Sequence, residues 1–250
     1  MKNEKKHNLE WLVLVLAVIF IGIVAWQELH GNYKFNIGKK SKRSYVELTD
    51  TNVNGIDLRI YTPHKVSYSL FVGDIDRSDS TILFATQAAD VRADNGAING
   101  SFVLKGEQLA KGGSKKGFCA IIDDNVTVGV DGSTTLFGEA IDKGGYFFRQ
   151  FPLVDNGKLV ENDIKGKSIR RALCDRKGKI FTVEALSEVT FHDFAQALVD
   201  FGVDNAIYLV GSTAAYGWAV DADGVRHEFG NPEASKKWKN TNYLVMRAKR

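Results

Sequence analysis

The pattern of hydrophobic and polar residues changes near residue 45. Residues 11–26 form one apolar run, WLVLVLAVIFIGIVAW, with no charge and no polar face. From Tyr45 onward, short runs alternate between apolar and polar positions, and this two-residue period is typical of strands that bury one face. The pattern therefore predicts an apolar N-terminal segment followed by a strand-rich body.

Five short turn sequences divide the body into predicted β-hairpins. Asn-Gly and Asp-Gly pairs favour the tight turns that join antiparallel strands, because both residues tolerate a positive φ. The predicted turns are at Asn54-Gly55, Asp124-Asn125, Asn156-Gly157, Lys177-Gly178 and Asp223-Gly224.

One amphipathic helix is predicted after the fourth hairpin. Thr190 and Asp193 have the spacing of a capping box, with Asp in place of the usual Glu, and Gly202 is a suitable stop. Between them, apolar residues recur at steps of three and four, at Phe191, Phe194, Leu198 and Phe201.

The apolar run 206–210 follows this helix and predicts a buried strand, which ends in a loop of small residues at 211–217. Ligands often bind beyond the carboxyl ends of strands in such a strand–helix–strand arrangement. We predict an α+β fold, with one domain over 45–250 that has a mixed, strand-rich sheet and a few packing helices.

The N-terminal part divides into a basic n-region (1–10), a signal anchor or signal peptide (11–26) and a basic linker (27–44). Sixteen helical residues span about 24 Å, less than the roughly 30 Å of a bilayer core. Trp11 and Trp26 stand where interfacial aromatic residues are usual. The chain is therefore predicted to reach a bacterial-type cell envelope, anchored with its domain outside the cytoplasm, or secreted if the segment is cleaved.

The positive charge belongs to the N-terminal part. Residues 1–43 contain eight Lys or Arg and three Asp or Glu, whereas residues 44–250 contain 25 and 27. The body therefore has no excess positive charge that favours nucleic acid, and no nucleic-acid partner is predicted. Cys119 and Cys174 are too few for a four-cysteine zinc site, and a disulfide or two buried thiols both remain open. No metal and no cofactor are predicted.

Four short elements follow one another along the body. Residues 97–102 read AINGSF, and residues 170–174 read RRALC and lead into the Lys177-Gly178 hairpin. Residues 183–185 read VEA at the end of that hairpin, and residues 209–214 read LVGSTA after the helix. In order and spacing these elements resemble the phosphodiester glycosidase family, and the resemblance covers roughly Asn54 to Met246.

The family has Asn-Gly-Gly-Phe-Phe, Arg-x-Ala-Ile-Gly, Val-Asp-Gly and Leu-Asp-Gly-Gly-Gly-Ser at the corresponding places. Its best-known members remove N-acetylglucosamine from a phosphodiester to uncover mannose 6-phosphate. This chain departs from the pattern at Val210, which replaces the Asp of the last element. It also departs at Ser212 and Thr213, which replace two glycines, and at Cys174, which replaces the glycine after Arg-x-Ala-Ile.

The resemblance implies a hydrolase that cleaves a sugar 1-phosphodiester in a glycan or envelope polymer. Arg170 is expected to meet the phosphate, because a guanidinium binds phosphate with two parallel hydrogen bonds. Glu184 is expected to stabilise the oxocarbenium-like charge on the sugar, and Asn99 to orient the substrate. Further contacts with the substrate are expected from Ser101, Arg171, Gly211, Ser212, Thr213 and Tyr216.

These roles require Asn99, Arg170 and the 211–217 loop to converge on one pocket. The alternative is a glycan-binding or envelope interaction module of the same fold that does not cut its ligand. Val210 favours that alternative, since it removes the family's aspartate, whereas Asn99, Arg170 and Glu184 favour the enzyme. In both cases the expected partners are a glycan or sugar-phosphate polymer and, through the N-terminal segment, a membrane.

Overall fold

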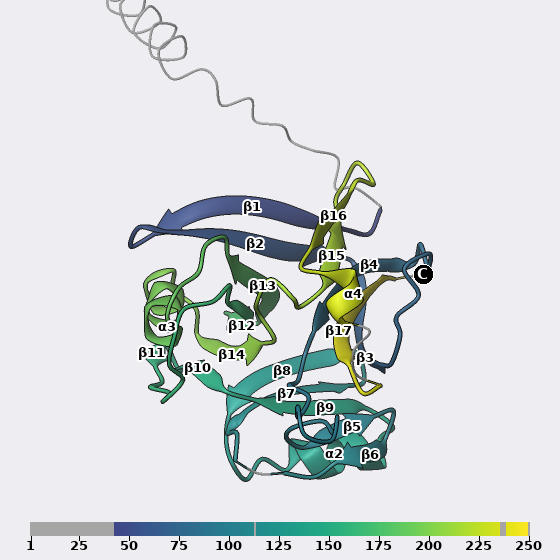
Figure 1. Ribbon diagram of the computed structural model, residues 1–250. Helices are drawn as coiled ribbons and strands as arrows, with labels where there is room; N and C mark the ends of the chain where they lie inside the picture. The colour runs from purple at the N-terminus through teal and green to yellow at the C-terminus, as the bar shows by residue number, and fades with distance from the viewer. Residues whose placement is uncertain (1–42, 113, 236–238, 250) are drawn as a thin grey trace, which may run out of the picture. The chain divides into compact units, whose positions relative to one another are not determined.

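The computed structural model describes residues 43–112, 114–235 and 239–249, all within one unit, Arg43–Arg250 (Figure 1). The predicted n-region (1–10), the predicted signal segment (11–26) and all but the last two residues of the predicted linker (27–44) lie outside the described residues. Within the described ranges, no helix is long and apolar enough to cross a membrane.

The described residues form three sheets. The seven-stranded sheet has the order β1-β2-β13-β12-β14-β10-β11. Its strands are β1 (Tyr45–Val53), β2 (Ile56–His64), β13 (Lys179–Ala185), β12 (Arg171–Arg176), β14 (Asn205–Leu209), β10 (Pro152–Asp155) and β11 (Lys158–Leu159).

The two other sheets have five strands each. One contains, in order, β16 (Arg226–Phe229), β15 (Gly217–Val220), β4 (Ile82–Gln87), β17 (Asn242–Ala248) and β3 (Val66–Val72). The other contains β6 (Glu107–Ala110), β5 (Phe102–Leu104), β9 (Tyr146–Gln150), β7 (Gly117–Ile122) and β8 (Asn125–Val130).

The strand-rich character agrees with the sequence, but the single mixed sheet is wrong. Every strand pairing among the described residues is antiparallel. The sequence predicts a strand on either side of one helix, and two strands joined in this way usually run parallel. In the structure, β12 lies between β13 and β14 and pairs antiparallel with both, so these two strands run parallel without touching. The unit is present, and its strands are separated by one antiparallel strand.

The predicted hairpins are present, and one turn is shifted by a residue. At Asn54-Gly55, Asn156-Gly157 and Lys177-Gly178 both turn residues have a positive φ, which allows the tight turn. Between β7 and β8 the turn lies at Asp123-Asp124 rather than Asp124-Asn125, since Ile122 pairs with Asn125. The Asp223-Gly224 pair lies in a longer loop between β15 and β16.

Helix α3 (Phe191–Asp200) has the predicted ends. The Thr190 side chain accepts a hydrogen bond from the backbone N–H of Asp193, which satisfies one free donor of the first turn. Gly202 follows the helix with a φ of +84°. The helix packs on β10 and β11, and its apolar stripe lies among the alternate residues of β2, β12 and β13 that face it (Figure 1).

Two further helices are short: α2 (Leu136–Asp142) packs against β7 and β9, and α4 (Pro232–Ser235) is a single turn. The opposite face of the seven-stranded sheet packs on the other two sheets, and the main apolar core lies between them. At one end of the seven-stranded sheet, strands β13 and β14 end and strand β12 begins. Strand β16 lies next to this end of the sheet.

Candidate functional site

A buried cluster of three polar side chains lies at this end of the seven-stranded sheet. Glu184 near the end of β13 is 6% exposed, and Arg171 at the start of β12 is 1% exposed. Arg171 Nε and Nη2 donate to Glu184 Oε1 at 2.8 and 2.6 Å, and the Tyr61 hydroxyl donates to Glu184 Oε2 at 2.6 Å. Both oxygens of the carboxylate are therefore held in place.

Strand alternation explains why these residues meet. Arg171 lies directly opposite Glu184 in the β12–β13 register, and β13 pairs on its other side with β2, which carries Tyr61. Successive residues of a strand point to opposite faces, so Glu184 and Arg171 face away from α3. Val183 and Ala172, one residue away, face the helix.

The cluster holds Tyr61 in its neutral form. Burial and the neighbouring Glu184 carboxylate raise the pKa of Tyr61 far above its usual value. The phenol therefore stays protonated at neutral pH, and its hydroxyl donates a hydrogen bond to Glu184. This keeps the carboxylate oriented.

Strand β16 covers the cluster. The Arg171 guanidinium lies 4.2 Å from the centre of the Phe229 ring, and the Tyr61 and Phe229 ring centres are 5.7 Å apart. Phe229 fits here because Gly217 opposite has no side chain; an added Cβ would overlap the Phe229 ring and the carbonyl of Ala85. The hairpin β15–β16 thus closes one side of the site.

A cavity of about 370 Å³ opens beside this cluster. Its wall includes Arg59, Tyr61, Arg171, Glu184, Ser212, Thr213, His227 and Phe229. Arg59 neighbours Glu184 in the β2–β13 register and donates its Nε and Nη2 to Asp50 at 2.7 Å each. The cavity therefore combines a fixed carboxylate, hydroxyl groups and positive charge.

The loop after β14 forms another part of the wall. An added Cβ at Gly211 would overlap the carbonyl of Ile169, so this residue must be small for the loop to pass β12. Ser212 has a φ of +89° and donates its backbone N–H to the Ile169 carbonyl at 2.9 Å. Ser212 also lines a second cavity of about 400 Å³, together with Val210 and Asp90.

Arg170 lies outside this cavity, and the predicted convergence of Asn99, Arg170 and the 211–217 loop is wrong. Arg170 Nη2 donates to the carbonyl of Gly166 at 2.9 Å and Nε to that of Val189 at 3.3 Å. Its guanidinium lies over the ring of Phe191, the first residue of α3. Arg170 stands directly before β12, and it faces the helix side whereas the next residue, Arg171, faces the cavity.

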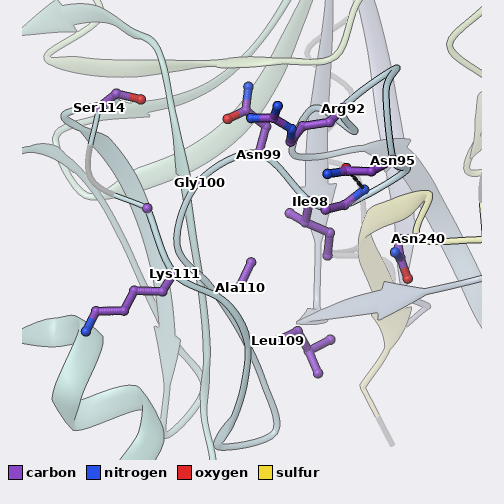
Figure 2. A pocket seen from close by; sticks show the side chains of 12 residues that line it. Arg92, Asn95, Ile98, Asn99, Gly100, Leu109, Ala110, Lys111, Ser114 and Asn240 are labelled. Carbon is purple, nitrogen blue, oxygen red and sulfur yellow. Dashed lines mark hydrogen bonds between the residues drawn. The ribbon is translucent and has the colours of Figure 1, made fainter.

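Asn99 lines a different cavity, of about 590 Å³. Figure 2 shows Asn99 in its wall with Arg92, Asn95, Lys111 and Asn240. Ser101 is 8% exposed, and its hydroxyl donates to the carbonyl of Gly112 at 2.7 Å, which fixes the β5–β6 hairpin rather than presenting a free hydroxyl. These two residues thus lie apart from the cavity beside Glu184.

Tyr216 does not offer a surface for stacking on a sugar. It is 1% exposed and packs against Trp218, which is equally buried, in a core formed with β4 and β17. Burial also raises the pKa of Tyr216. The sequence predicted that Tyr216 contacts the substrate, but its ring, just before β15, is buried in the protein.

The sequence did not predict that Arg59, Tyr61 and His227 line the cavity. Arg59 and Tyr61 stand two residues apart on a strand that the Asn54-Gly55 turn predicts, so the sequence could show that they share one face of that strand. The sequence could not show that this face lies beside Glu184, which is 123 residues away from Tyr61. No motif in the sequence marks His227, which lies on β16.

No three His, Cys, Asp or Glu side chains within the described ranges are placed to hold a metal ion. Cys119 and Cys174 are buried free thiols on separate strands, and burial raises the pKa of each far above its usual value. Of the two possibilities that the sequence left open, the structure has two buried thiols.

Residues 80–246 match the model of the phosphodiester glycosidase family. The chain belongs to this family. The matched region begins before β4 and includes the Asn99, Arg170–Arg171, Glu184 and 209–214 elements, as the sequence resemblance predicted. No curated protein matches the chain at a significant level.

The chain is similar in fold to several solved structures, including these two. The catalytic domain of zebrafish N-acetylglucosamine-1-phosphodiester alpha-N-acetylglucosaminidase, auto-inhibited by its pro-peptide, has a TM-score of 0.57 at 14% identity, over 83% of each chain. A hypothetical protein from Synechocystis has a TM-score of 0.62 at 12% identity, over 83% of this chain and 62% of that one. At these identities the likeness shows the fold alone.

Proposed function

We propose that this protein is an exported, membrane-anchored hydrolase that cleaves a sugar 1-phosphodiester in a glycan or envelope polymer. The observation that carries the proposal is the buried Glu184–Arg171–Tyr61 cluster on the wall of a cavity. A carboxylate whose two oxygens are held in place by Arg171 and Tyr61 is suited to stabilise positive charge on a sugar ring. Membership of the family supports the same reaction.

In this reaction the bond from the anomeric carbon to the phosphate oxygen breaks, and the electron pair stays with the phosphate. Glu184 stabilises the oxocarbenium-like charge that develops on the sugar. Water then adds to the anomeric carbon, and the products are the free sugar and a phosphate monoester. Because a phosphate monoester is an acidic leaving group, its departure needs little help from a general acid.

The phosphate is expected to lie between Arg59 and the loop after β14. Arg59 lies at the cavity wall and uses Nε and Nη2 for Asp50, which leaves its Nη1 for the phosphate, and Ser212 and Thr213 supply hydroxyl donors. Arg170, which the sequence favoured for this role, has its guanidinium on backbone carbonyls behind the sheet. We therefore assign phosphate binding to the cavity side and a structural role to Arg170.

Hydrolysis of a panel of sugar 1-phosphodiesters by the full chain tests the proposal. Glu184→Gln is expected to lower kcat by about 100-fold or more, because it removes charge stabilisation from the transition state. Glu161→Gln is the matched control, since Glu161 is exposed and lies outside the cavity.

Equal rates for Glu184→Gln and the wild type would refute the assignment of Glu184. A folded wild-type protein that binds a sugar phosphate and hydrolyses none of the panel would instead support the glycan-binding module, to which the Val210 substitution points.

A further inference from the structure

A histidine–aspartate pair faces the same cavity as Glu184. His227 lies on β16 and lines this cavity, and its Nε2 is 2.7 Å from Asp221 Oδ2. The other oxygen of Asp221 accepts hydrogen bonds from the backbone N–H groups of Asp223 at 2.9 Å and Val225 at 2.8 Å. The turn between β15 and β16 therefore fixes the carboxylate that orients the imidazole.

The face of β16 shows where His227 points. His227 and Phe229 stand two residues apart, so they share one face of the strand. Phe229 on that face contacts the guanidinium of Arg171 and the ring of Tyr61. Of the alternate residues, Arg226 lies over the Trp218 ring, and Glu228 pairs with Arg77 while it also lines the edge of the cavity. His227 is thus directed toward the Glu184 cluster.

The state of the pair follows from its contacts. The hydrogen bond from His227 is the main cause that lowers the pKa of Asp221, and the two backbone donors add to it. Asp221 is therefore ionised and can only accept, so Nε2 of His227 carries the proton of this hydrogen bond. In the neutral ring with this tautomer Nδ1 is the acceptor, and no side chain or backbone group in the described part of the chain donates to it.

The proposed reaction needs such an acceptor. Both oxygens of Glu184 are engaged by Arg171 and Tyr61, so this carboxylate is placed to stabilise charge rather than to take a proton. The side chain of His227 is 40% exposed, which leaves it open to water in the cavity.

We infer that His227, oriented by Asp221, is the general base of this site, an inference that rests on the proposed hydrolysis. Nδ1 of His227 takes one proton from the attacking water as the water oxygen bonds to the anomeric carbon. The bond from that carbon to the phosphate oxygen breaks, and the phosphate monoester leaves with the electron pair. Asp221 is a positioning residue, which holds the ring with Nδ1 toward the cavity.

The two other described histidines that pair with carboxylates lack this placement. His192 Nδ1 is 3.0 Å from Glu161 Oε1, and His64 Nε2 is 2.9 Å from Glu47 Oε2. The His64 ring also stacks on Tyr45. Neither lines the Glu184 cavity. His192 is therefore a matched control: the same kind of pair, outside the site.

The experiment compares steady-state hydrolysis of a sugar 1-phosphodiester by the full-length wild type, His227→Gln, Asp221→Asn and His192→Gln. His227→Gln is expected to lower kcat by about 100-fold or more at an unchanged KM, because it removes the base and leaves the phosphate contacts. Asp221→Asn is expected to lower kcat as well, by at least about tenfold, again with KM unchanged. His192→Gln is expected to match the wild type.

The results that would overturn the inference can be told apart. Wild-type kcat in folded His227→Gln, or a loss confined to KM, means that His227 is not the base. Should His227→Gln fail to fold, Asp221→Asn provides the test, since Asn can still accept the two backbone hydrogen bonds of the turn. Absence of turnover in the wild type itself refutes the proposed function and the base with it, whereas active wild type with unchanged variants refutes the base alone.

Discussion

At the scale of single residues, Arg171 connects the parts of the site. Besides its two bonds to Glu184, its Nη1 donates to the carbonyls of Ala215 at 2.9 Å and Val210 at 3.3 Å. The guanidinium is planar and has five N–H donors, so it can serve the carboxylate, the loop after β14 and the Phe229 ring together. A lysine has neither the plane nor the donors for this arrangement.

Replacement of Arg171 by Met is expected to destabilise the protein by about 3–5 kcal/mol, because Glu184 is then buried without its positive partner. The double variant Arg171→Met, Glu184→Met is expected to recover much of that loss, since two apolar side chains leave no charge unpaired. Urea unfolding of the full chain measures both. A single variant within about 1 kcal/mol of the wild type would show that the pair contributes little to folding.

At the scale of elements, the sequence predicted the local structure but not the pairing of strands that lie far apart in the chain. Turn residues with positive φ marked the hairpins, and Thr190 and Gly202 marked the ends of α3, because these effects act within a few residues. The pairing of β2 with β13 joins segments more than 100 residues apart, and no local pattern encodes it. For this reason the sequence placed Glu184 at a strand end but missed Tyr61.

The same limit explains the choice of Arg170 over Arg171. Two adjacent arginines on a strand face opposite sides, and the sequence alone does not say which side α3 covers. The family pattern aligned Arg170 with the expected arginine. In the structure, its guanidinium lies on α3, and its neighbour carries the contact with Glu184.

The position of β16 over the site depends on Gly217. Gly217→Ala is expected to destabilise the protein by about 1–3 kcal/mol and to displace Phe229 from Arg171, because the new methyl group overlaps Phe229 and the Ala85 carbonyl. Gly138→Ala is the control: nothing lies within 4 Å of an added Cβ there, and α2 gains about 0.5–1 kcal/mol. Thermal unfolding of both variants distinguishes them, and equal stability would contradict the packing at Gly217.

At the scale of the whole described unit, strand β17 joins two distant parts of the chain within one sheet. β17 lies between β3 and β4 in the five-stranded sheet, so the C-terminal residues complete a sheet that begins near residue 66. Arg247 of β17 pairs with Asp79, and Thr81 also hydrogen-bonds Asp79 before β4 begins. These contacts join β17 to the segment that precedes β4.

The contacts of Asp79 with Thr81 and Arg247 predict that the stability of the fold depends on pH in the acid range. Hydrogen bonds from Thr81, then from Arg247, lower the pKa of Asp79 to about 2, below the roughly 3.9 of an unfolded chain. The folded state binds this proton less readily, so the stabilisation is full above about pH 4 and is lost as the pH falls toward 2. The gap in unfolding free energy between wild type and Asp79→Asn is expected to shrink over that range in urea titrations. A gap that stays constant from pH 5 to pH 2 would contradict this.

The bond that breaks tests the central claim most directly. Hydrolysis of a sugar 1-phosphodiester by the full chain in ¹⁸O-labelled water, followed by ³¹P NMR, shows which product takes the water oxygen. A glycosidase that acts at the anomeric carbon through the Glu184 cavity leaves the phosphate monoester unlabelled, and Glu184→Gln forms almost no product. Label in the phosphate, or equal product from Glu184→Gln, would contradict the account.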